Sequence, residues 1–152
     1  MTEFGWSACS VLSNSCYQKD DTGQNLWLLM PKFTVTHIPA LLEYAKDTTS
    51  ISQFPINPVS SRPPYPSGRR YFILSECLLW VVEGIRTNKT YPSHDPYLVD
   101  SSKPSAEKLK GLTKKEILGV RELYYNWWNQ SAIIPEWWLT TPPLSGTTYS
   151  WD

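Results

Sequence analysis

Apolar residues recur with helical spacing in three separate stretches of this chain. The first stretch has apolar residues at positions i, i+3, i+4 and i+7, namely Ile38, Leu41, Leu42 and Ala45. Such a repeat is typical of one face of an amphipathic helix. Thr36 is placed to cap this helix, and Pro39 falls in its first turn, where a missing N–H group costs little. The pattern predicts a helix over residues 36–46.

The second stretch is apolar around most of a helical circumference. Its apolar positions are Ile73, Leu74, Cys77, Leu78, Trp80, Val81 and Ile85. A helix this apolar is covered on most sides by other elements. We therefore expect residues 70–86 to form a central helix with Trp80 buried.

The third stretch carries its own start signal. Thr113 and Glu116 have the spacing of a capping box, and Leu112 and Ile117 have that of a hydrophobic staple. One helical face is then apolar: Ile117, Val120, Tyr124, Trp127 and Trp128. We predict a helix over residues 113–129 that packs on the other two.

Long irregular segments separate these helices. Five of the 13 prolines fall between residues 55 and 66, and each removes a backbone donor and restricts the residue before it. The tail from residue 133 also contains prolines, but it is rich in Trp and Tyr and should wrap back over the helices. The predicted fold is mainly α, a single small domain of about three principal helices wrapped by long proline-rich irregular segments. Residues 1–25 are predicted to form a loose arm, and residues 26–152 the helical domain.

Composition excludes several classes of protein. Fourteen basic and fourteen acidic residues cancel, so the chain lacks the positive charge of a nucleic-acid-binding protein. No apolar run approaches the ~18 residues of a membrane span. The opening residues, MTEFGWSACSVLSNSC, have neither the basic nor the unbroken apolar region of a signal peptide. Three cysteines, Cys9, Cys16 and Cys77, show no zinc-binding spacing. We expect no metal and no cofactor, and Cys77 should be a buried, unreactive thiol.

Two glutamates on the central helix allow two interpretations. Glu76 and Glu83 are seven residues apart and fall on one face, where a carboxylate pair can divide acid and base roles. Alternatively, both accept hydrogen bonds from arginines or from backbone donors of the irregular segments, and we favour this structural interpretation. His94 next to Asp95 suggests a turn, because adjacent side chains diverge too far to form a catalytic relay.

Exposed aromatic residues are the candidate binding residues. Tyr and Trp combine a large contact area with a polar edge, which suits peptide, protein or glycan partners. Trp137 and Trp138 are adjacent, so at most one should point fully inward, and Tyr65 lies in an exposed proline-rich segment.

Several blocks of the chain, including SECLLWVVEGIR, YPSHDPYLVD, VRELYYNWW and PLSGTTYSW, resemble a family of short uncharacterised proteins of gut anaerobic bacteria. The resemblance covers about residues 30–152. It implies a mostly helical domain of unknown function in a protein that is exported or lipid-anchored, with a periplasmic or cell-surface location, and it assigns no activity.

The sequence therefore favours a non-catalytic binding or interaction protein associated with a bacterial envelope. One alternative is an enzyme of the hydrolase type that uses Glu76, Glu83 and His94. A second alternative is a protein that neutralises a partner toxin.

Overall fold

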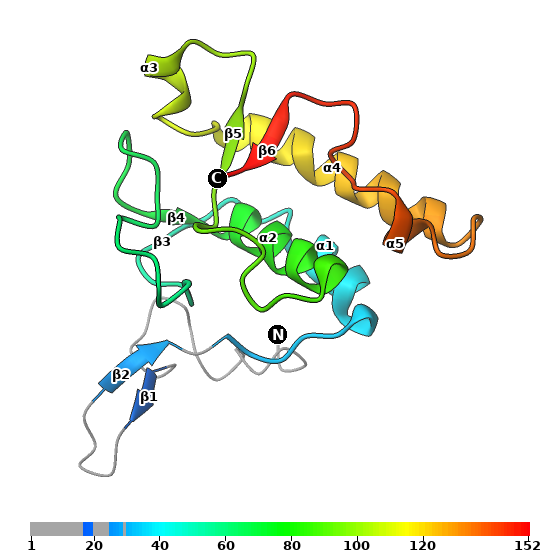
Figure 1. Cartoon of the computed structure of the whole chain (residues 1–152), viewed down its shortest axis with the longest axis horizontal. Helices are drawn as coiled ribbons and strands as arrows, with labels where there is room; N and C mark the ends of the chain where they lie inside the picture. Colours follow the sequence, from blue (N-terminus) through cyan, green and yellow to red (C-terminus); the bar gives the residue numbers. More distant parts are fainter. Residues whose placement is uncertain (1–16, 20–24, 29) are drawn as a thin grey trace.

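The computed structural model of the chain describes residues 17–19, 25–28 and 30–152. Figure 1 shows helices gathered around α2, with long irregular connections at the periphery. In chain order the elements are β1 (Tyr17–Lys19), β2 (Asn25–Leu28), a 3-10 turn (Val35–His37), α1 (Ile38–Tyr44), β3 (Ser50–Ile51), β4 (Phe72–Ile73), α2 (Leu74–Thr87), β5 (Leu98–Asp100), α3 (Ser105–Lys108), α4 (Lys114–Ser131), α5 (Trp137–Thr140) and β6 (Tyr149–Trp151). Most of the predicted arm, residues 1–25, lies outside the described residues.

Helix α2 forms the centre of the core, as its apolar circumference predicts. Helices α1 and α4 both pack against it and against each other. Ten of its residues are buried, and Trp80 is completely inaccessible to solvent. The Trp80 indole N–H donates to the Ser93 hydroxyl at 2.7 Å, so the polar edge of this large side chain is satisfied inside the protein.

Short antiparallel strand pairs join segments that are far apart in the sequence. Strand β3 pairs with β4, with Ser50 opposite Ile73. Strand β5 pairs with β6, with Leu98 opposite Trp151, and Figure 1 shows this pair beside one end of α4. Together with β1 and β2, the described residues form three two-stranded sheets.

The prediction of a mainly α fold is wrong, because the protein has a mixed α/β structure. The missed strands are two to four residues long, too short to show the alternation of apolar and polar residues that identifies a strand. Their partners lie up to about fifty residues away. Buried backbone groups of an irregular segment must still find hydrogen-bond partners, and pairing between distant segments provides them.

The helix boundaries agree with those predicted from the sequence except at the first residues of α1 and α2. Thr113 caps α4 as predicted, because its hydroxyl accepts from the Glu116 amide while the Glu116 carboxylate accepts from the Thr113 amide. Thr36 does not cap α1, since the chain enters through a 3-10 turn whose cap is Thr34. Helix α2 begins at residue 74 rather than 70, because the residues before it pair as β4.

The C-terminal segment wraps back over the helices, as its aromatic content predicts. The Trp151 indole N–H donates to the Tyr124 hydroxyl at 2.9 Å. The Trp127 indole N–H donates to the Thr141 carbonyl at 2.6 Å. These two bonds attach the segment to the C-terminal half of α4, at residues one turn apart.

Candidate functional site

The Glu76 carboxylate is buried, and other groups of the protein bind both of its oxygens. Its side chain is 1% exposed and forms an ion pair with Arg69, whose side chain is 6% exposed. Its second oxygen accepts from the Leu98 amide at 2.7 Å, which fixes the start of β5. Burial raises the pKa of Glu76, while the Arg69 guanidinium and the Leu98 amide lower it. The interpretation of Glu76 as a buried acceptor is confirmed.

Glu83 is engaged in the same way by other partners. Arg86, one turn further along α2, binds its carboxylate through two nitrogens. The Tyr124 hydroxyl donates to it at 2.9 Å. Burial raises the pKa of Tyr124 well above its ordinary value, and the Glu83 charge adds to the effect. Glu83 therefore links α2 to α4.

The three residues of the hydrolase alternative are not assembled into a site. His94 is exposed, and the Ser93 hydroxyl donates to the Asp95 carbonyl oxygen at 2.9 Å instead of to the histidine. Glu76, Glu83 and His94 line neither of the two pockets described below. No group of three or more metal-ligating side chains occurs among the described residues.

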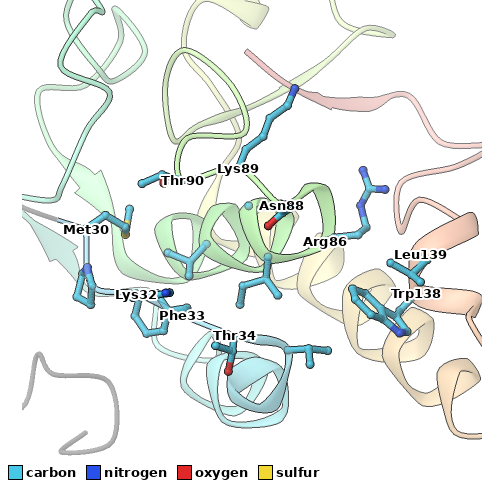
Figure 2. A pocket seen from close by; sticks show the side chains of 15 residues that line it. Met30, Lys32, Phe33, Thr34, Arg86, Asn88, Lys89, Thr90, Trp138 and Leu139 are labelled. Carbon is cyan, nitrogen blue, oxygen red and sulfur yellow. The ribbon is translucent and has the colours of Figure 1, made fainter.

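A groove of about 710 Å³ runs along α2. We call it the α2 groove, and Figure 2 shows Met30 and Trp138 at its two ends with α2 between them. Its apolar lining combines the segment before α1, the last turns of α2 and the start of α5: Met30, Phe33, Val35, Val81, Ile85, Trp138 and Leu139. The groove therefore presents an aromatic and aliphatic surface to solvent.

Cationic side chains border this apolar surface. Lys32, Arg86 and Lys89 line the α2 groove, and none of the described residues that line it is acidic. Arg86 is held by Glu83, whereas Lys32 and Lys89 are exposed and form no ion pair within the described part of the chain. Figure 2 shows the Lys89 side chain extending away from the floor. The groove consequently has an excess of positive charge.

The sharp turn at the end of α2 shapes this part of the groove. Asn88 adopts the left-handed conformation (φ 55°), which asparagine tolerates better than most residues. The Lys89 amide then donates back to the Gly84 carbonyl at 2.9 Å. A Cβ atom on Gly84 would lie 2.6 Å from the Lys89 carbonyl oxygen. Glycine is needed here so that the chain can fold closely over the helix.

Trp137 and Trp138 both lie at the start of α5, and both are partly buried. Glu136, in the left-handed conformation (φ 61°), turns the chain into this helix. Trp138 lines the α2 groove, whereas Trp137 does not. The prediction that these residues form a binding surface is untested by the geometry.

Tyr65 lies elsewhere. It is partly buried, and its ring packs edge-on against Phe72 with 5.7 Å between the centroids. It lines a second pocket of about 530 Å³, here called the Tyr65 pocket. The structure thus places Trp138 and Tyr65 at two separate sites, and Trp137 lines neither of them.

Sequence reasoning missed Lys32, Phe33 and Lys89. They stand in segments without periodicity, and they meet only because residues 30–35 run alongside the end of α2. The one local signal was Gly84-x-x-x-Asn88 at the end of α2, since Gly and Asn near a helix end indicate a tight reversal. That signal locates the turn but not the groove.

The chain belongs to a family described as a domain of unknown function (DUF4943), which it matches over residues 9–152. Comparison of the chain with curated proteins and with solved structures gives no significant match. None of the described helices combines the length and apolar character that crossing a bilayer requires.

Proposed function

We propose that this chain is a non-catalytic binding protein and that its α2 groove receives a polypeptide partner with apolar residues next to acidic ones. The observation that supports this proposal is the charge of the groove. Its floor is apolar and, among the residues that the structure describes, Lys32 and Lys89 at its border have no ion-pair partner and no carboxylate lines it. Such a surface favours acidic over basic partners, because like charges at an interface are strongly disfavoured.

The form of the groove favours a polypeptide over a small molecule. Small-molecule sites enclose most of their ligand. Here Leu139, which lines the groove, is 52% exposed. Ile134 and Ile133, in the segment before α5, are 42% and 74% exposed. Exposed apolar surface of this kind is typical of sites that contact another protein. Trp138 is the expected anchor, since tryptophan is enriched among the residues that dominate interface energies.

The same proposal includes a bacterial envelope location, which is supported by the resemblance of the sequence to exported and lipid-anchored proteins. Fractionation of source cells that express the native gene tests it, and recovery of the protein only with the cytosol would contradict it. A neighbouring toxin gene would favour an acidic toxin as the partner.

Selection of phage-displayed random peptides on the whole chain tests the groove directly. We expect the selected peptides to carry Asp or Glu beside apolar residues. Their affinity should fall about tenfold or more for Trp138→Ala, as for other interface anchors. Binding to a Lys32→Gln, Lys89→Gln double variant should be weaker and less dependent on salt, because exposed charges are screened by ions.

Leu118→Ala provides the matched control. Leu118 is 37% exposed on α4 and does not line the groove, so its truncation should leave peptide affinity unchanged. Selected peptides that bind Trp138→Ala as tightly as the unmodified chain would contradict the proposal. A failure to select any peptide would do the same.

A further inference from the structure

A second pocket, unrelated to the α2 groove, has the composition of an anion-binding site. The Tyr65 pocket lies between the proline-rich connector before β4, strand β5 and the end of α3. It shares no lining residue with the α2 groove. Its cationic lining residues are Arg62, Arg69, Arg70 and Lys108.

Arg69 is the central observation. Its side chain is 6% exposed and uses Nη2 to pair with Glu76. Its Nε and Nη1 atoms are buried without a hydrogen-bond partner among the described residues. Buried polar groups are nearly always hydrogen-bonded, and a guanidinium has five N–H donors. Arg69 also lines the Tyr65 pocket. Because its two unpartnered nitrogens are buried, the guanidinium must rotate to present them to a bound oxyanion.

The lining also contains one carboxylate, Asp152, which is bound by Arg62, and two further cations are left unpaired among the described residues. Arg62 is already paired with Asp95 and Asp152, so its charge is compensated. Arg70 and Lys108 form no ion pair within the described part of the chain. Together with Arg69 they can contribute charge-assisted hydrogen bonds, which are stronger than neutral ones.

The remaining walls suit a ring. Tyr65 and Tyr97 contribute aromatic surfaces, and Pro66 adds a flat apolar one. Tyr65 is held in place by its contact with Phe72. The volume of about 530 Å³ is within the usual range of small-molecule sites and exceeds what a single inorganic ion fills.

We propose that the Tyr65 pocket binds a ring-bearing oxyanion, namely a sugar that carries a carboxylate, phosphate or sulfate group. The oxyanion binds to Arg69, Arg70 and Lys108, and the sugar ring packs against Tyr65 and Tyr97. No bond is formed or broken in this step.

Titration of the nitrogen-labelled whole chain, followed by NMR, tests the proposal. The probes are a hexuronate, a hexose phosphate, a sulfated hexosamine, neutral glucose and inorganic phosphate. We expect at least one acidic sugar to shift the Arg69 Nε–H signal, while glucose leaves it unchanged. The Arg121 Nε–H group, which donates to the Leu42 carbonyl elsewhere in the core, serves as an internal control. The acidic sugar that binds identifies whether the anionic group is a carboxylate, a phosphate or a sulfate.

Variants separate a ligand-binding role from a structural one. Arg70→Gln with Lys108→Gln should weaken binding about tenfold or more, because two charged donors are lost. Lys115→Gln removes an exposed charge from α4, outside the pocket, and should have no effect. The proposal is overturned if no acidic sugar shifts the Arg69 signal, or if the double variant binds as well as the unmodified chain. Equal binding of inorganic phosphate and hexose phosphate would also overturn the assignment of a ring.

Discussion

Replacing Glu76 by alanine should remove about 3–5 kcal/mol from the free energy of unfolding, because it leaves a buried guanidinium without its carboxylate. Arg69 and Glu76 are 6% and 1% exposed, so solvent cannot replace the lost partner. The Leu98 amide also loses its acceptor. Domains are typically stable by only ~5–15 kcal/mol, so this single change would remove a large part of the total.

Glu76→Gln should cost less, about 1.5–3 kcal/mol, the usual range for a hydrogen bond to a charged group. The amide keeps the shape of the side chain and one oxygen, which can still accept from Leu98. Urea unfolding followed by circular dichroism measures both variants. Glu107, which is exposed on α3, provides matched Ala and Gln controls that should each change stability by less than about 0.5 kcal/mol.

The pH dependence gives a second measurement on the same residue. The pKa of Glu76 is raised above its ordinary value of 4.5 by burial. The folded protein therefore binds a proton at the Glu76 carboxylate more tightly than the unfolded chain does. The proton-linked part of the stability is then complete below pH 4.5 and is lost as the pH rises through the raised pKa, whereas the contacts with Arg69 and Leu98 remain. Glu76→Gln should remove this component. If Glu76→Ala costs less than about 1 kcal/mol, the buried ion pair does not have the structural role assigned to it.

Three other measurements test the structure. Gly84→Ala should destabilise by about 1–3 kcal/mol through overpacking, because its Cβ would lie 2.6 Å from a backbone oxygen. Gly119→Ala on α4, where a Cβ meets nothing within 4 Å, should stabilise by about 0.5–1 kcal/mol in urea unfolding; the opposite order would contradict the packing at the end of α2. Hydrogen bonds from Ser102 and Thr148 lower the pKa of Asp100 from 3.8 to about 2, so its stabilisation is present above pH 3.8 and is lost as the pH falls toward 2. In calorimetric scans, the Asp100→Asn variant should therefore lose less stability than the unmodified chain as the pH falls from 3.8 toward 2. An unchanged loss of stability would argue against the hydrogen bonds from Ser102 and Thr148. Cys77 is buried and its pKa is raised well above 9.0, chiefly by burial, so mass spectrometry should find it unlabelled by a thiol reagent until the protein is unfolded; rapid labelling of the native protein would show that the α2 core opens.

Local patterns were sufficient to locate the three longest helices, α1, α2 and α4, but not the four-residue helices α3 and α5. The capping box at Thr113 and Glu116 makes its bonds within four residues, so its outcome depends little on the rest of the fold. The near-complete apolar circumference of α2 likewise required burial of Trp80 and favoured arginine partners for its glutamates. Only the tertiary structure decided which arginine pairs with which glutamate, since Arg69 reaches Glu76 and Arg86 reaches Glu83.

The strands and both pockets depend on contacts between distant segments. Leu98 pairs with Trp151 across more than fifty residues, and neither segment alone has the length or alternation that identifies a strand. The α2 groove brings Phe33, Ile85 and Trp138 together from three elements. The residue type and its spacing in the sequence indicate what chemistry a side chain can perform. Long-range packing determines which residues surround it. For this protein the sequence determined a helical core with satisfied carboxylates, and the tertiary structure decided the mixed α/β fold and where Trp138 and Tyr65 face solvent.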